Sequence, residues 1–115
     1  MRRAEVHQTG TLAGYLTETD SRSYRFDYLP GYRGRSISLT MSVRPEPYKF
    51  DKFPPFFEGL LPEGRQLEAL LRSHKLDRND LMGQLLAVGE DVVGSVQIIP
   101  EPPLTETGRV EGEEA

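Results

Sequence analysis

Short stretches within the first 41 residues alternate hydrophobic and polar side chains, whereas residues 54–88 follow a helical spacing. The clearest alternation is at 24–28, where three aromatic residues take turns with Arg25 and Asp27. A period of two is typical of a strand with one buried face. Weaker forms of the pattern predict three further strands, over residues 4–8, 12–16 and 37–41. Gly14 interrupts the second of these strands and indicates a bulge or a close backbone approach.

Three helical segments are predicted in the middle of the chain, over residues 54–61, 65–74 and 77–88. Pro54 and Pro55 suit the first turn of the first segment, where a missing N–H costs nothing. Apolar residues then recur every three or four positions, which places them on one face of each helix. Asp77 is the predicted N-cap of the third segment, and Gly89 is the predicted left-handed residue that ends it.

The order of these elements is typical of an α+β fold. Four strands come first, three helices follow, and a fifth strand over residues 92–99 ends at Pro100. Short links between the early strands favour antiparallel pairing. We therefore expect a small antiparallel sheet of about five strands, partly barrel-like, with three helices between the fourth and last strands. Residues 44–51, which contain two prolines, are predicted to be a loop.

The length of 115 residues indicates one domain, followed by an acidic end. Residues 1–100 are expected to form the domain. Residues 101–115 are rich in glutamate and poor in large apolar side chains, so we expect a disordered tail there. No signal peptide and no membrane span is predicted, and the expected location is the cytoplasm.

The composition argues against several kinds of active site. The chain has no cysteine and only two histidines, which argues against a zinc site. Neither a glycine-rich phosphate loop nor a serine–histidine–aspartate arrangement is present. Six carboxylates stand near predicted helix ends, and capping explains most of them better than acid–base catalysis does: Glu58, Glu63, Asp77, Asp80, Glu90 and Asp91. We therefore predict no enzymatic activity, no catalytic residue, no cofactor and no metal. The net charge of −4 also argues against direct binding of nucleic acid.

A dense group of aromatic and apolar residues around the first helical segment is the candidate binding surface. The simplest alternative is that these rings only fill the core. A helix buries one stripe, however, and Phe56 and Phe57 lie about 100° apart on it, so one of them can face a partner. The stretch from Leu60 to Gly64 reads either as a plain turn or as a rigid corner that presents a recognition surface. The residues predicted to bind a partner are Tyr48, Phe53, Phe56, Phe57, Leu60, Leu61, Pro62 and Glu63.

Two stretches of the sequence resemble the amino-terminal domain of the HipA family of bacterial toxin kinases. They are PYKFDKFPPFFEGLLPEG at 47–64 and KLDRNDLMGQLLAVGEDVVGSVQIIP at 75–100. The positions that match the family pattern are Pro47, Tyr48, Pro54, Pro55, Phe56, Phe57, Glu58, Leu60, Leu61, Pro62, Glu63, Gly64, Leu85, Leu86, Ala87, Val88, Gly89, Asp91, Val93 and Gly94. With the opening strands, which are also similar, the resemblance covers about residues 3–100.

The resemblance implies a role in a toxin–antitoxin system. In HipA-type proteins this domain precedes a kinase core, and the sequence contains none of that core's elements. The chain is similar to HipS, a short antitoxin that accompanies a truncated kinase, HipT, and a DNA-binding protein, HipB. The implied function is to bind and neutralise a separately encoded HipA/HipT-type serine/threonine kinase, with a HipB-like helix-turn-helix protein as a further partner. The alternative is a structural subunit that completes a split kinase without inhibiting it.

Overall fold

The computed structural model describes residues 2–19, 23–89 and 95–101. Within these ranges the chain forms five strands and three helices, which confirms the α+β class. In chain order they are β1 (Arg3–Gln8), β2 (Thr11–Glu18), β3 (Tyr24–Tyr28), β4 (Tyr48–Phe50), α1 (Pro55–Glu58), α2 (Gly64–His74), α3 (Leu81–Val88) and β5 (Val96–Pro100). Residues 102–115 of the predicted tail, and residues 92–94 of the predicted last strand, lie outside the described residues.

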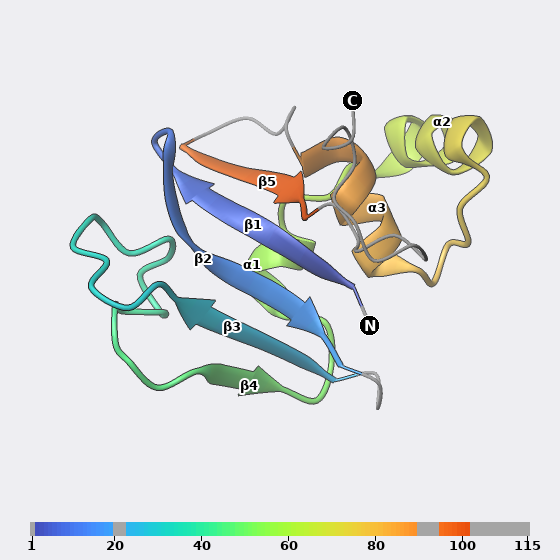
Figure 1. The fold of residues 1–115 in the computed structure, drawn as a ribbon. Coiled ribbons are helices and arrows are strands. Elements are labelled where there is room, and N and C mark those ends of the chain that lie inside the picture. Colours follow the sequence, from blue (N-terminus) through green and yellow to red (C-terminus); the bar gives the residue numbers. More distant parts are fainter. Residues whose placement is uncertain (1, 20–22, 90–94, 102–115) are drawn as a thin grey trace, which may run out of the picture.

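The strands form one antiparallel sheet in the order β4-β3-β2-β1-β5. The last strand returns to pair with the first, so both lie side by side at one end of the sheet (Figure 1). The sheet does not close into a barrel, because β4 and β5 are its two edges. Helices α1 and α3 lie against one face, and α2 lies farther out beyond α3 (Figure 1). Among the described residues, no helix covers the opposite face of the sheet.

The pairing of β1 with β2 contains the irregularity that Gly14 predicts. Val6 pairs with Gly14 and His7 pairs with Leu12, so Ala13 is the extra residue of a bulge. A side chain at Gly14 would also collide with the carbonyl oxygen of Asp27 on the next strand. The bulge and the close backbone approach both occur at this one position.

The prediction of a strand over residues 37–41 is wrong. This segment makes only an isolated bridge between Ser38 and Met41, with a tight turn between them. Ile37 and Met41 are 5% and 4% exposed, whereas Leu39 is fully exposed. The alternating apolar pattern arises because the turn directs its two ends inward and its tip outward, and not because one face of a strand is buried.

The fourth strand lies instead within residues 44–51, which were predicted to be a loop. Phe26 pairs with Tyr48, and Tyr24 pairs with Phe50, at the edge of the sheet. An edge strand tolerates neighbouring prolines because one side of its backbone has no partner strand. The three helices therefore still lie between the fourth and last strands, as predicted.

The core lies between the sheet and the helices α1 and α3. Its central side chains have no exposed surface; the largest are Phe26, Phe57, Leu16, Met82, Leu85, Ile98 and Val6. Helix α2 contributes little to this core, since Leu70 is its only buried residue. It is attached chiefly through α3, which makes it the outermost element of the helical side.

Both predicted ends of α3 need correction. The N-cap is Asp80, whose carboxylate accepts a hydrogen bond from the amide of Gly83 at 3.0 Å. Asp77 instead accepts from the amide of Asn79 in the preceding turn. Gly89 has a right-handed backbone, with φ at −57°, so it is not a left-handed stop. Glycine is needed there because a side chain would collide with Ile98 on β5.

Candidate partner-binding surface

The predicted corner between α1 and α2 forms because α1 ends after a single turn, at Glu58. Pro54 and Pro55 begin α1, and the amides of Leu60 and Leu61 donate to carbonyl oxygens of that turn at 3.1 Å. Gly64 then takes a φ of +63°, which favours glycine, and starts α2. The chain is thus redirected within a few residues by backbone hydrogen bonds, with proline at one end and glycine at the other.

The structure divides the eight predicted binding residues into three groups. Phe53 and Phe57 are core residues, 7% and 0% exposed, so they have almost no surface to offer a partner. Glu63 is exposed. The partly buried residues, each with some accessible surface, are Tyr48, Phe56, Leu60, Leu61 and Pro62. Phe53 and Phe57 can therefore act only by supporting such a surface from below.

The two neighbouring phenylalanines of α1 have the different roles that helix geometry allows. Phe57 packs against Phe26 of β3, with ring centroids 5.9 Å apart. Phe56 lies edge-on to Phe57 at 5.1 Å and remains partly exposed. The exposed ring is thus held by a buried one, which fixes its position.

We call the group Phe56, Leu60, Leu61, Pro62 and Glu63 the corner surface. Its centre is apolar, and the exposed Glu58, Glu63 and Arg65 lie in or beside it in the chain. None of these three charged groups makes an ion pair within the described part of the chain. An apolar centre beside charged groups is the usual composition of a protein–protein interface.

Tyr48 belongs to a different region. Its hydroxyl donates to the carbonyl oxygen of Ser42 at 2.8 Å, and the Arg44 guanidinium lies 3.6 Å from its ring centre. Among the described residues no ring contact joins Tyr48 to Phe56. The structure therefore places Tyr48 with the loop before β4, and not with the corner surface.

The other face of the sheet carries mostly polar and charged side chains. Two ion pairs on it join Arg3 to Glu101 and Arg25 to Asp27, at 2.7 and 2.9 Å, and the His7 ring lies 2.9 Å from the Glu5 carboxylate. Arg3 also lies 4.1 Å from the ring centre of Tyr15. A polar and charged face is well suited to water, so the corner surface is the better candidate for a partner.

One cluster of charges fixes the helical side to the sheet. Arg2 donates to Glu18 of β2 at 2.7 Å and to Asp80, the cap of α3, at 2.8 Å. The hydrogen bonds from Arg2 hold the pKa of each carboxyl group below its usual value and raise the pKa of the guanidinium. Arg2 therefore joins the beginning of α3 to the sheet. Because α1 and α2 both contact α3, the same cluster helps to fix all three helices.

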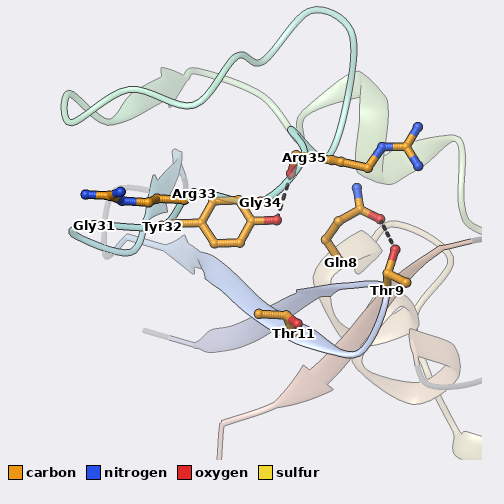
Figure 2. A pocket seen from close by; sticks show the side chains of 8 residues that line it. All are labelled: Gln8, Thr9, Thr11, Gly31, Tyr32, Arg33, Gly34 and Arg35. Atoms are coloured by element: carbon orange, nitrogen blue, oxygen red, sulfur yellow. Dashed lines mark hydrogen bonds between the residues drawn. The ribbon is translucent and has the colours of Figure 1, made fainter.

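The loop between β3 and β4 is the region that the sequence prediction missed. Beside it lies an open hollow of about 570 Å³, between the turn after β1 and residues 31–35. Figure 2 shows the ring of Tyr32 against this hollow, whereas the guanidiniums of Arg33 and Arg35 point away from it in opposite directions. The hollow thus lacks convergent charged groups. The sequence did contain a signal for this region: the segment from Leu29 to Pro45 has three arginines and no carboxylate.

In the residues that the structure describes, no group of three or more histidine, cysteine, aspartate or glutamate side chains could hold a metal ion. None of the described helices is long and apolar enough to cross a membrane.

Comparisons with known proteins agree on one relationship. The family model of the HipA N-terminal domain matches residues 4–99. An uncharacterised protein of Haemophilus influenzae is 34% identical over 101 residues, which cover 88% of this chain and 94% of that protein. The solved N-terminal domain of HipA toxin matches with a TM-score of 0.71 and 29% identity, over 88% of this chain and 93% of that one.

A second solved structure shows the same fold within a longer chain. It is the Shewanella oneidensis complex of HipA, HipB and operator DNA, with a TM-score of 0.68 and 20% identity. The match covers 96% of this chain but only 27% of the other. At that level of identity the likeness concerns the fold alone.

Proposed function

Because the chain belongs to the HipA N-terminal domain family, we propose that it is a non-catalytic antitoxin that binds and neutralises a separately encoded HipA-type serine/threonine kinase. The observation that carries this proposal is the corner surface, whose partly exposed apolar residues Phe56, Leu60 and Leu61 pack against the core, Phe56 in ring contact with the buried Phe57. A HipB-like DNA-binding protein would join the complex through the kinase, and the complex would form in the cytoplasm.

The structural neighbours support a protein partner. In the HipA–HipB–operator complex the matched fold makes up 27% of its chain, so it is attached there to a much larger remainder. A domain attached in this way uses part of its surface to pack on that remainder. We propose that the equivalent contact is made between separate chains here, and that the corner surface lies at its centre.

The first experiment is co-expression with the open reading frame adjacent to this gene, followed by pull-down and a growth assay. We expect a stable complex, a kinase that is toxic alone, and growth restored by this chain. A complex with a kinase that is inert alone would support the alternative, a structural subunit. Equal phosphorylation of the kinase's target with and without excess of this chain would contradict inhibition.

The surface itself is tested by Leu61→Asp. We expect this change to weaken the complex by about 30-fold, the loss typical of a central interface residue. Lys49→Glu is the matched control, because Lys49 is exposed on β4 and forms no ion pair within the described residues. Normal binding by a folded Leu61→Asp protein would remove the corner surface from the proposal.

A further inference from the structure

The loop from Leu29 to Pro45 differs in charge from the rest of the molecule. It contains Arg33, Arg35 and Arg44 and no carboxylate, although the whole chain has a net charge of −4. In Figure 1 it projects from the end of the sheet that is opposite α2. We call residues 33–44 the tip loop. This end of the molecule therefore carries a local excess of positive charge.

The tip loop is held to the core at two points on either side of its turn, Ile37 and Met41, by one buried hydroxyl group. Tyr28, which is 6% exposed, donates to the carbonyl oxygen of Met41 and accepts from the amide of Ile37 at 3.0 Å. The side chains of Ile37 and Met41 are themselves buried. Gln8 adds a hydrogen bond to the carbonyl oxygen of Ser36 at 2.9 Å. The two sides of the turn cannot separate without losing these contacts.

Leu39 is presented at the end of this fixed loop. The amide of Thr40 donates to the Ser38 hydroxyl at 3.2 Å, and the amide of Met41 donates to the carbonyl oxygen of Ser38 at 3.1 Å. These bonds close a turn that leaves Leu39 fully exposed. A single exposed leucine is common on protein surfaces. Leu39 is distinguished by the hydrogen-bonded turn that holds it out, in a loop that also contains Arg33 and Arg35.

Two of the three arginines in the tip loop are available to a partner. Arg44 is already engaged, since it stacks on Tyr48 and donates to the carbonyl oxygens of Glu46 and Pro47. Arg33 and Arg35, in contrast, are exposed and make no ion pair within the part of the chain that the structure describes. Their guanidiniums extend to opposite sides of the loop (Figure 2).

We propose that the tip loop is a second contact with the kinase chain, in which Leu39 enters an apolar socket on the kinase that is rimmed by carboxylates. This inference rests on the proposed function. Arg33 and Arg35 match an acidic rim in charge, and the turn that already fixes the backbone at Leu39 reduces the backbone entropy lost on binding. A nucleic acid fits less well, because three positive charges neutralise few phosphates and the remainder of the chain is acidic.

The test measures the affinity and association rate of the complex between this chain and the co-expressed kinase. Leu39→Ser should raise the Kd by about 30-fold, and Leu39→Met, which keeps the apolar volume, should bind as the unmodified chain does. The double change Arg33→Glu and Arg35→Glu should lower the association rate and reduce its dependence on salt. Lys49→Glu again serves as the control for loss of a positive charge.

The outcomes separate this inference from the proposed function. If the unmodified chain binds no kinase, the proposed function fails and this inference fails with it. If it binds and Leu39→Ser binds equally well, only the tip-loop contact is overturned. A duplex DNA probe at low salt provides a further arm. If this chain binds the DNA probe, and if the double arginine change abolishes that binding while Leu39→Ser does not affect it, the loop is a nucleic-acid contact and the proposed socket on the kinase is wrong.

Discussion

The corner surface and the tip loop both expose apolar side chains, but they are connected to the core in different ways. At the corner, Phe56 is in direct ring contact with the buried Phe57, so one apolar group serves the core and the surface together. In the tip loop the two roles are assigned to different residues. Ile37 and Met41 face inward, and Leu39 faces outward.

This difference determines what a mutation can report. A change at the corner alters both folding and binding, because the exposed and buried rings support each other. A change at Leu39 alters the surface alone. In Figure 1, α1 lies behind the middle of the sheet, whereas the loop between β3 and β4 projects beyond one end of it, so the two regions present separate surfaces to a partner.

The largest effect on stability is expected from Phe57→Ala. This ring is fully buried between α1 and β3, and its removal should lower the free energy of unfolding by about 3–5 kcal/mol. Phe56→Ala, as the matched change at the neighbouring position, should cost less than half as much, because Phe56 is partly exposed. Urea unfolding measures both. Equal losses would show that the corner does not separate into a buried and a presented ring.

A smaller loss is expected from Tyr28→Phe, which tests how the tip loop is attached. The change removes the hydroxyl that pairs with both Ile37 and Met41, and leaves two buried backbone groups without a partner. We expect a loss of about 1–3 kcal/mol. Tyr32→Phe is the control, because that hydroxyl pairs with the exposed carbonyl oxygen of Arg35. If the two changes cost the same, the buried hydroxyl does not hold the loop.

Acid should loosen the helical side before it loosens the tip loop. Glu18 and Asp80 have pKa values held below their usual 4.5 and 3.8 by hydrogen bonds from Arg2. Their contribution is therefore present above those usual values and is lost as pH falls through the lowered ones. Burial raises the pKa of Tyr28, so that hydroxyl stays neutral in acid. Hydrogen exchange of α3 and of residues 37–41 as a function of pH measures the contrast.

The size of the acid effect is set by solvent. The side chain of Arg2 is 40% exposed, so its pairs should stabilise the fold by about 1 kcal/mol. Replacement of Arg2 by Gln should remove most of the acid dependence of α3. Replacement of Arg3 by Gln is the matched control, since the Arg3–Glu101 pair is more exposed and does not touch α3. If both replacements change α3 equally, the cluster is not specific to this helix.

Local patterns predicted most of the fold. The strands 4–8, 12–16 and 24–28 and all three helices were found, because the spacing of their apolar residues is regular, although both predicted ends of α3 were wrong. Gly14 was interpreted correctly for a similar reason: a missing side chain in a strand requires a close neighbour, and Asp27 provides it. Such features depend on residues that lie near one another in the sequence.

The errors occur where contacts with distant residues override the local pattern. A strand at 37–41 was predicted from alternation, but the hydroxyl of Tyr28 converts that segment into a fixed turn. The partners of Tyr48 and the burial of Phe53 and Phe57 likewise depend on how the loop and the sheet meet in space. Residue spacing indicated that one of the two phenylalanines of α1 would be buried, and only the packing of β3 shows which one.

The smallest effect on stability is expected from Leu39→Ser, and it separates the two interpretations of residues 37–41. If Leu39 were a buried strand residue, its truncation would lower the free energy of unfolding by about 2–5 kcal/mol. As the exposed end of a turn, it should change the free energy of unfolding by no more than about 0.5 kcal/mol in either direction. Met41→Ser, only two residues away and buried, should cost several times more. A large loss at Leu39 would mean that the side chain is covered by the protein itself, and the socket on a partner would then have no free leucine to bind.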